Sequence, residues 1–367
     1  MHTATMIRRS VPVLMTAILL AASFVPAASA QQRSSARPPA FEVDPMWPAV
    51  PNDWVLGEVT SIAVDGDDHV WVLHRPRSIP EDRRARSAPP VLEFDAEGRL
   101  LRSWGGSAEG YDWPEREHGI WVDARDFVWI SGNGGWPRPS EGGSTDDMIL
   151  KFTGDGELVM QIGKRGASEG NADTANVHQP ADVFVHGPAN EVYVADGYGN
   201  RRVIVFDADT GAFKRMWGAF GEAPDDAPAP EGTAPADAPQ FGLVHAIKVS
   251  DDGIVYVADR GNRRVQWFTT EGTYLSQLVI DGEAPAAPAG FAFSPDAEQR
   301  FLYIVESANA RVLIYDRASM TQVGMFGSRS AAPGGMDIAH HIAVDSQGNL
   351  YTAEIVNNRR AQKFVAR

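Results

Sequence analysis

The sequence predicts an all-β fold, a six-bladed β-propeller, because one pattern recurs about six times between residues 51 and 367. Each copy holds four short runs rich in Val, Ile, Tyr, Phe and Trp, residues that suit a pleated, half-buried surface. Asp- and Gly-containing turns such as DGD, DAEG and DDG separate the runs. Four antiparallel strands repeated in this way are typical of propeller blades arranged around a central channel.

The copies can be followed by their opening runs, which read VTSIAVD, HGIWVD, ADVFVH, HAIKVS, GFAFSP and HHIAVD in chain order. The last copy ends with the chain before a fourth run appears. The N-terminal segment 54–57, WVLG, resembles the fourth runs that end in WG. We therefore expect this N-terminal strand to complete the last blade and close the ring, which would cover the remaining sheet edge.

The first thirty residues are expected to be a signal peptide. Arg8 and Arg9 precede an apolar run over 11–25, and the sequence ASA at 28–30 supplies a small-residue cleavage site. The run is short for a membrane span. We expect a protein exported to the periplasm or secreted, without membrane insertion. Residues 31–50 would form a linker, and 51–367 a single monomeric propeller.

Composition excludes several classes of function. The chain has no cysteine, which rules out thiolate metal ligands and cysteine nucleophiles. The formal net charge of −15 opposes binding to nucleic acid.

One column of the repeat carries a candidate metal site. The second, fourth and sixth copies have His118, His245 and His340 at the start of their first run. The other copies have small residues there, namely Thr60, Ala181 and Gly290. Alternate blades of a six-bladed ring lie about 120° apart. Three imidazoles at one height predict a three-histidine metal site like that of a catalytic zinc with one open position.

The turns between second and third runs share a motif, seen in VADGYGNRRV, VADRGNRRV and VESANARV. This motif resembles the NHL repeat of six-bladed propellers, and the resemblance extends over 59–364. It implies that most polar residues of the motif hold the turn in place.

Within that group the chain resembles peptidyl-α-hydroxyglycine α-amidating lyase, which cleaves a carbinolamide to a peptide amide and glyoxylate. The resemblance implies zinc on the three histidines and a small-molecule or peptide substrate. It also implies a catalytic Tyr198 in the sequence DGYGNR, an arginine at Arg260 in ADRGN, and another at Arg75 after a histidine.

The chain departs from that family at three points. His341 and Ile338 stand where the family has an aspartate that helps to hold calcium and a methionine. The disulfide cysteines are also missing. These departures argue against a calcium site and leave the zinc ligands in place.

The residues themselves suggest a chemistry. In an antiparallel blade the first strand starts on the face where the second ends, so the histidines should share a face with Tyr198, Arg260 and Arg75. Tyr198 could act as general base while Arg75 or Arg260 binds a carboxylate. This set suits carbinolamide cleavage. The alternatives are a non-catalytic propeller that binds a protein, peptide or glycan, and a hydrolase of the lactonase kind. The latter usually centres on calcium with oxygen ligands.

Overall fold

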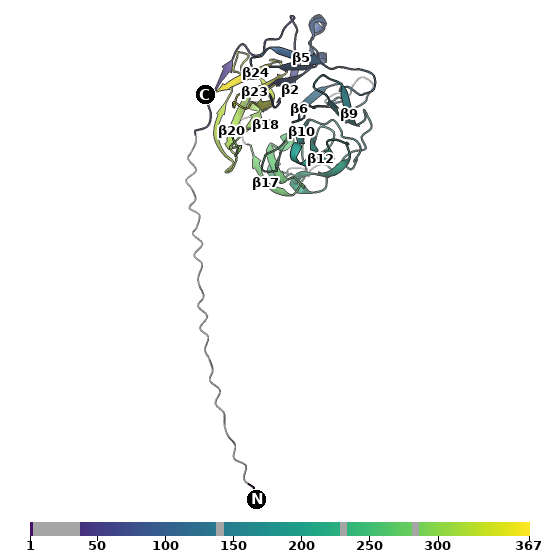
Figure 1. The fold of residues 1–367 in the computed structure, drawn as a ribbon, viewed down its shortest axis with the longest axis vertical. Coiled ribbons are helices and arrows are strands. Elements are labelled where there is room, and N and C mark those ends of the chain that lie inside the picture. The colour runs from purple at the N-terminus through teal and green to yellow at the C-terminus, as the bar shows by residue number, and fades with distance from the viewer. Residues whose placement is uncertain (3–36, 137–142, 228–232, 281–285) are drawn as a thin grey trace. The chain divides into compact units, whose positions relative to one another are not determined.

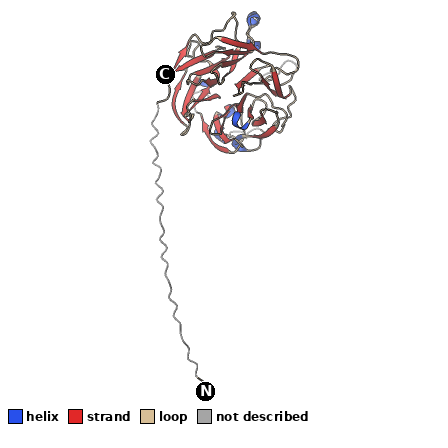
Figure 2. Ribbon diagram, viewed as in Figure 1, coloured by secondary structure: helices blue, strands red, loops and turns tan. Residues whose placement is uncertain are grey.

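The structure is a computed structural model that describes residues 1–2, 37–136, 143–227, 233–280 and 286–367. Residues 38–367 form a compact unit that contains six four-stranded sheets (Figure 1). Strands dominate this unit (Figure 2), and the predicted six-bladed propeller is confirmed. Apart from residues 1 and 2, the predicted signal peptide lies outside the described residues.

The blades follow one another along the chain, and the strands of each are antiparallel; in blades 1 to 5 they pair in sequence order. Blade 1 comprises β2 (Glu58–Val64), β3 (Val70–Arg75), β4 (Val91–Phe94) and β5 (Leu100–Trp104). Blade 2 comprises β6 (Glu117–Val122), β7 (Val128–Gly132), β8 (Met148–Phe152) and β9 (Leu158–Gly163). Blade 3 comprises β10 (Asp182–His186), β11 (Glu191–Asp196), β12 (Arg202–Asp207) and β13 (Phe213–Trp217).

The second half of the ring repeats this arrangement. Blade 4 comprises β14 (Val244–Val249), β15 (Ile254–Asp259), β16 (Arg264–Thr269) and β17 (Tyr274–Val279). Blade 5 comprises β18 (Pro288–Phe293), β19 (Phe301–Glu306), β20 (Arg311–Asp316) and β21 (Thr321–Phe326). Blade 6 comprises β22 (Ile338–Val344), β23 (Leu350–Ile355), β24 (Ala361–Ala366) and β1 (Phe41–Asp44).

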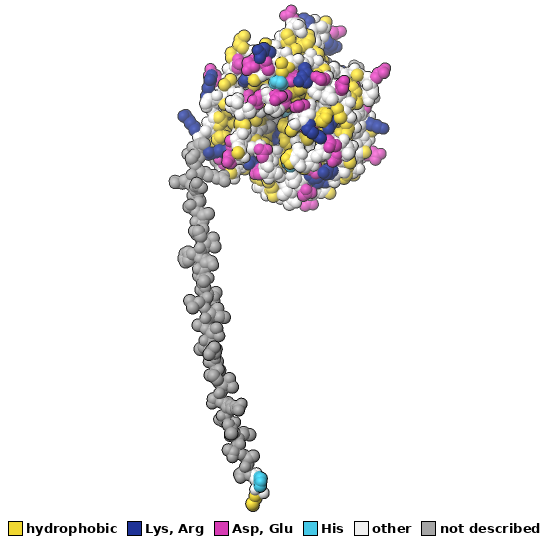
Figure 3. Space-filling model, viewed as in Figure 1, with side chains coloured by type: hydrophobic (Ala, Val, Ile, Leu, Met, Phe, Trp, Pro, Cys, Tyr) yellow, Lys and Arg dark blue, Asp and Glu magenta, His cyan; other side chains and the backbone are white. Residues whose placement is uncertain are grey.

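Short 3₁₀ helices lie in the connecting loops. Their bounds are η1 (Pro76–Ser78), η2 (Glu81–Arg86), η3 (Gly187–Ala189), η4 (Ala219–Gly221), η5 (Pro235–Asp237), η6 (Arg260–Asn262) and η7 (Ser307–Asn309). Among the described residues, no helix has the length and apolar character needed to cross a bilayer. Basic and acidic side chains are interspersed over the face shown in Figure 3.

The strand that completes blade 6 is not the expected one. β1 pairs antiparallel with β24, with Phe41 opposite Ala366, and the purple and yellow strands lie together in Figure 1. The prediction for 54–57 is therefore wrong, since Val55 makes only an isolated bridge to Ser87. β1 also falls inside 31–50, which we expected to be a linker. Phe41 packs on Phe326 at 4.9 Å between ring centroids, so its apolar side chain ties this segment to the ring.

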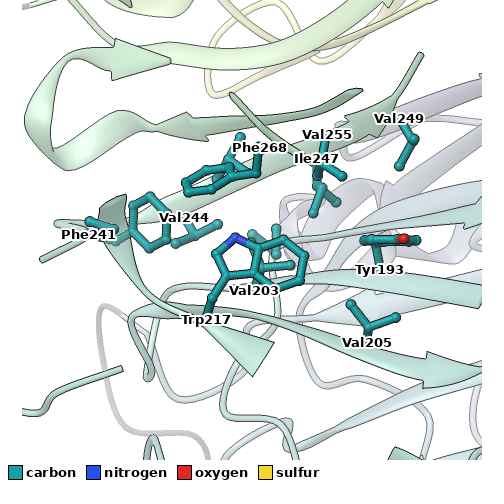
Figure 4. Packing of buried hydrophobic residues seen from close by; sticks show 14 residues of the cluster. Tyr193, Val203, Val205, Trp217, Phe241, Val244, Ile247, Val249, Val255 and Phe268 are labelled. Atoms are coloured by element: carbon teal, nitrogen blue, oxygen red, sulfur yellow. The ribbon is translucent and has the colours of Figure 1, made fainter. Parts of the chain in front are cut away.

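Packing between neighbouring sheets fixes the blades. Between blades 3 and 4, Tyr193 and Val205 meet Ile247 and Phe268 in one buried cluster, with Trp217 between them (Figure 4). Fully burying one such side chain contributes about 1.5–3 kcal/mol. The first strand of each blade, which faces the channel, is thereby held in a defined position.

The shared turn motif is structural, as the resemblance implied. In the β11–β12 turn, Asp196 accepts hydrogen bonds at 2.8 Å from both Asn200 and Arg202. In the β15–β16 turn, Asp259 is paired in the same way with Asn262 and Arg264. Both ion pairs have fully buried side chains. These anchored turns carry Tyr198 and Arg260.

Candidate metal centre

The three histidines of the predicted metal site each lie at a β-bulge of their strand. Pairing with the second strand shifts register at His118 in β6, at His245 in β14 and at His340 in β22. A β-bulge bends a strand and re-aims a side chain. The three rings consequently converge, with centroid separations of 4.7–5.0 Å, and all three are buried.

Each imidazole is oriented by the blade next to it. The Nδ1 atoms of His118, His245 and His340 lie 2.7, 2.7 and 2.6 Å from the backbone oxygens of Ala181, Ala289 and Thr60. A carbonyl oxygen only accepts, so each Nδ1 carries the proton and each Nε2 offers a lone pair. The small residues of the alternate blades therefore supply the carbonyls that set the tautomer. In blade 5 this residue is Ala289 and not the predicted Gly290, because the bulge of β18 lies at Ala289.

The charge state also suits metal binding. Burial, followed by the neighbouring imidazoles, holds the pKa of His118 well below its usual value. Burial likewise lowers the pKa of His245 and His340, with Arg260 and other imidazoles adding to the effect. The three rings are thus neutral, which is the form that binds a metal.

The donor set fits zinc. One ligand atom from each histidine lies within 4.8 Å of the others. His245 Nε2 is buried and finds no hydrogen-bond partner within the described part of the chain. Leaving such an acceptor unpaired costs about 1–3 kcal/mol, which a shared ion would offset. Three neutral imidazoles around an open position are the ligand set of catalytic zinc.

Tyr198 lies against this centre, as the sequence predicted. Its hydroxyl is 2.9 Å from His118 Nε2 and donates to that lone pair when no ion takes it, while its ring meets His118 edge-on at 4.9 Å. The ring of Trp136 lies 4.7 Å away on Tyr198. Arg260 Nη1 lies 3.5 Å from the phenolic oxygen, so a cation adjoins the site of any negative charge that forms there.

Arg75 is also near, but its guanidinium is already engaged. Nε donates to the Glu117 carbonyl and Nη1 to Glu58, both at 2.7 Å, and Nη2 lies 3.5 Å from Asn133 Oδ1. The Glu117 bond holds the backbone immediately before His118. This arrangement supports a positioning role for Arg75 more directly than carboxylate binding.

Sequence reasoning missed Arg116. Its Nη1 donates to Asn133 at 3.1 Å, and its guanidinium lies 5.9 Å from the centroid of the Trp136 ring. Its Nη2 lies 3.9 Å from Glu58 Oε2. Burial, reinforced by the charge of Arg75, lowers the pKa of Arg116 to about 10. The sequence feature that could have pointed to Arg116 is its position two residues before His118.

His341 departs from the expected orientation. On a regular strand it would point away from His340, but the bulge turns both rings toward the channel, with their centroids 5.2 Å apart. Burial lowers the pKa of His341 to about 4, so the ring is neutral. Its Nε2 is buried, with no hydrogen-bond partner in the described ranges.

The surroundings of His341 do not fit calcium. The charges acting on it are those of Asp182 and Lys248, whose side chains lie 3.5 Å apart. Calcium takes six to eight oxygen ligands, often carboxylates. His341 stands where the amidating lyases have a carboxylate that helps to hold calcium. The remaining carboxylate, that of Asp182, is already accompanied by the Lys248 ammonium.

Comparison with known proteins identifies the repeat. The family described as NHL repeat matches residues 241–268, which span the first three strands of blade 4. This six-bladed propeller thus contains an NHL repeat in blade 4. A solved chain titled "Streptogramin B lyase structure" superposes on the NHL-repeat propeller with a TM-score of 0.55, covering 89% of this chain and 98% of that one. At 15% identity, this likeness concerns the fold alone.

Relatives of the NHL-repeat propeller fall into two groups. NHL repeat-containing protein 3 of Homo sapiens is 26% identical over 89% of this chain and 84% of its own. A probable peptidyl-alpha-hydroxyglycine alpha-amidating lyase of Caenorhabditis elegans is 22% identical over 83% and 81%. Peptidylglycine alpha-amidating monooxygenase of Rattus norvegicus is 34% identical over 61% of this chain, but over only 22% of its own. The resemblance to amidating lyases is thus supported as a distant similarity.

Proposed function

We propose that this NHL-repeat propeller is a metal-dependent lyase that cleaves a carbinolamide to an amide and glyoxylate. The observation that carries the proposal is the convergence of three neutral imidazoles, each with its tautomer set, beside Tyr198 and Arg260. The distant similarity to amidating lyases supports the same reaction class.

His118, His245 and His340 would hold the zinc. Zinc bound there supplies Lewis acidity, which makes the proton of a nearby hydroxyl easier to remove. The protein's own contribution begins with fixed ligands, because the carbonyls that hold each Nδ1 keep the Nε2 atoms aimed at one point.

Tyr198 is placed to move the proton. Its oxygen takes the carbinol hydroxyl proton, and the adjacent Arg260 stabilises the phenolate that would precede this step. As the carbon–oxygen double bond of glyoxylate forms, the carbon–nitrogen bond breaks. The proton then returns from Tyr198 to the departing nitrogen, which leaves as an amide, so the step is balanced without a further reactant.

The guanidinium groups favour an anionic substrate. Arg260 and Arg116 adjoin the phenol and its Trp136 neighbour, and each could bind a carboxylate next to the carbinol carbon. A substrate held in this way would present its hydroxyl to the open side of the histidine cluster.

A second function has its own support. The relative with the more extensive similarity is named only for its NHL repeats. A propeller that binds a protein, peptide or glycan without catalysis is therefore the competing proposal.

We also propose that the protein acts after export, on the strength of the N-terminal sequence alone.

The two functions differ in a simple assay. Purified protein loaded with zinc is incubated with N-benzoyl-α-hydroxyglycine, and benzamide and glyoxylate are quantified. The lyase proposal expects equal amounts of both products, with turnover lost on chelation and restored by zinc. Absence of turnover by zinc-loaded protein would contradict the lyase and favour the binding propeller.

A further inference from the structure

A cavity lies at the end of the channel opposite to the histidine cluster. Three residues after the histidine column, Trp121, Phe184 and Lys248 come from consecutive blades 2, 3 and 4. At the equivalent position, blades 5 and 6 have Ala292 and Ala343. These five side chains line one cavity of about 270 Å³. Large side chains on one side of the channel and alanines on the other therefore leave an off-centre pocket.

The walls of this pocket are largely apolar. Phe291 and Phe293 contribute aromatic rings, and Trp121 packs on Phe184 with ring centroids 4.5 Å apart. Lys248 brings an ammonium into these surroundings, 4.5 Å from the Trp121 ring centroid. A small ligand with an aromatic body would find hydrophobic contact on several sides.

Two donors of the pocket, on Lys248 and Trp121, lack a close acceptor. Lys248 Nζ has three N–H groups, and its recorded carboxylate contact is Asp182 at 3.5 Å. Close charge-assisted bonds measure about 2.7–2.9 Å, so this contact is long. Trp121 Nε1 is buried and has no hydrogen-bond partner among the residues that the structure describes. The pocket lining therefore has donor capacity for an anionic oxygen group.

We propose that this distal pocket binds a small aromatic carboxylate. The carboxylate accepts from Lys248, with the Trp121 N–H as a second donor, and the ring packs against Phe291 and Ala343. Asp182 remains beside the ammonium, which has enough N–H groups to serve both anions. Asp251, the acidic residue of the lining, is exposed to solvent.

The proposal is tested by calorimetric titration with benzoate, benzamide and benzyl alcohol. We expect saturable binding of benzoate that is about tenfold or more tighter than that of benzyl alcohol, because the charged hydrogen bond is lost in the alcohol. Lys248→Met should weaken benzoate by about the same factor and leave benzyl alcohol unchanged. Ala343→Leu should abolish binding of all three by filling the pocket.

Two controls separate this site from the metal centre. Arg260→Ala should leave benzoate binding unchanged, since Arg260 lies at the other end of the channel. Zinc uptake by Ala343→Leu should equal that of the native protein and report an intact ring. If Lys248→Met does not fold, Ala292→Leu and the comparison of the three probes still decide the matter.

Three results would overturn the proposal. Benzoate could fail to saturate the native protein at any accessible concentration. Its binding could vanish in Arg260→Ala and persist in Ala343→Leu, which would place it at the metal centre. Benzyl alcohol could bind as tightly as benzoate, which would leave an apolar pocket with no carboxylate site. None of these results depends on lyase activity.

Discussion

The two ends of the channel are built by the same inner strands but with different symmetry. At the histidine level, large and small residues alternate from blade to blade, so three rings meet near one point. Three residues further on, large side chains occupy consecutive blades and alanines follow, which leaves an off-centre pocket. The order of large and small residues from blade to blade thus determines what forms at a given height of the channel. Alternation brings side chains together at one site, whereas grouping of the large residues leaves a cavity.

The two ends of the channel also differ in their buried charges. The histidine end keeps its imidazoles neutral through burial and concentrates guanidinium groups at its rim. The distal end holds a buried ion pair, Asp182 with Lys248, beneath aromatic rings. If this comparison is right, changes at one end should leave the other end largely unaffected.

The largest expected effect is on catalysis at the histidine end. Tyr198→Phe should reduce turnover of the carbinolamide by about 10²–10⁴-fold, because the general acid–base group is removed. Zinc content and benzoate binding should not change. Tyr111→Phe, which removes a hydroxyl bonded to the Gly106 carbonyl, is the matched control and should retain activity. A Tyr198→Phe variant with native turnover would remove the phenol from the mechanism.

The next effect is on stability. Arg264→Met breaks the fully buried pair with Asp259 that anchors the turn carrying Arg260, and should cost about 3–5 kcal/mol. Urea unfolding measures the loss, and Arg99→Met, which removes a solvent-exposed guanidinium paired with Asp95, should change the free energy of unfolding far less. A loss of the same small size in both variants would mean that the motif does not anchor the turn.

A smaller effect concerns pH. Burial lowers the pKa of His74 to about 4, whereas an unfolded histidine titrates near 6.5. The unfolded chain therefore binds this proton first as the pH falls. The free energy of unfolding should decline from about pH 6.5 to about pH 4 by up to about 1.4 kcal/mol per pH unit from this group alone.

The His74→Gln variant isolates that contribution. Glutamine can still accept from the Gly57 amide and donate to the Pro89 carbonyl, the two bonds that His74 makes. Unfolding curves at several pH values should show a shallower acid dependence in the variant. Parallel curves for the two proteins would show that His74 is not neutral when buried.

The smallest expected effect is that of calcium. Because His341 and the Lys248 ammonium accompany Asp182, millimolar calcium should leave the thermal midpoint of the native protein unchanged. A His341→Asp/Lys248→Met variant restores a second carboxylate and removes the ammonium, and should gain stability with calcium through preferential binding to the folded state. A calcium-dependent midpoint in the native protein would contradict this reading of the donor set.

Much of this architecture followed from the repeat. Because the blades share one register, aligning their first strands was enough to bring His118, His245 and His340 together and to place Tyr198 and Arg260 beside them. Features that break the repeat were not accessible in this way. The bulge in β22 turns His341 toward the channel, whereas a regular strand would point it away from His340. The strand that completes blade 6, β1, lacks the WG ending on which the prediction for 54–57 rested.

Contacts between segments that are distant in the sequence were the other limit. Arg116 precedes its strand and acquires meaning only through Asn133 and Trp136, which belong to other segments. The distal pocket likewise arises from a column of residues that reads as ordinary apolar sequence in each blade. The large side chains become informative only when three consecutive blades are seen to face two alanines.

The most direct test of the account is the metal content of the purified protein. Plasma mass spectrometry should find about one zinc per chain, and this zinc should be lost in the His118→Ala/His245→Ala variant while circular dichroism shows the same strand content. A native protein that contains no metal and takes up none from added zinc would contradict the three-histidine centre, and the lyase proposal with it.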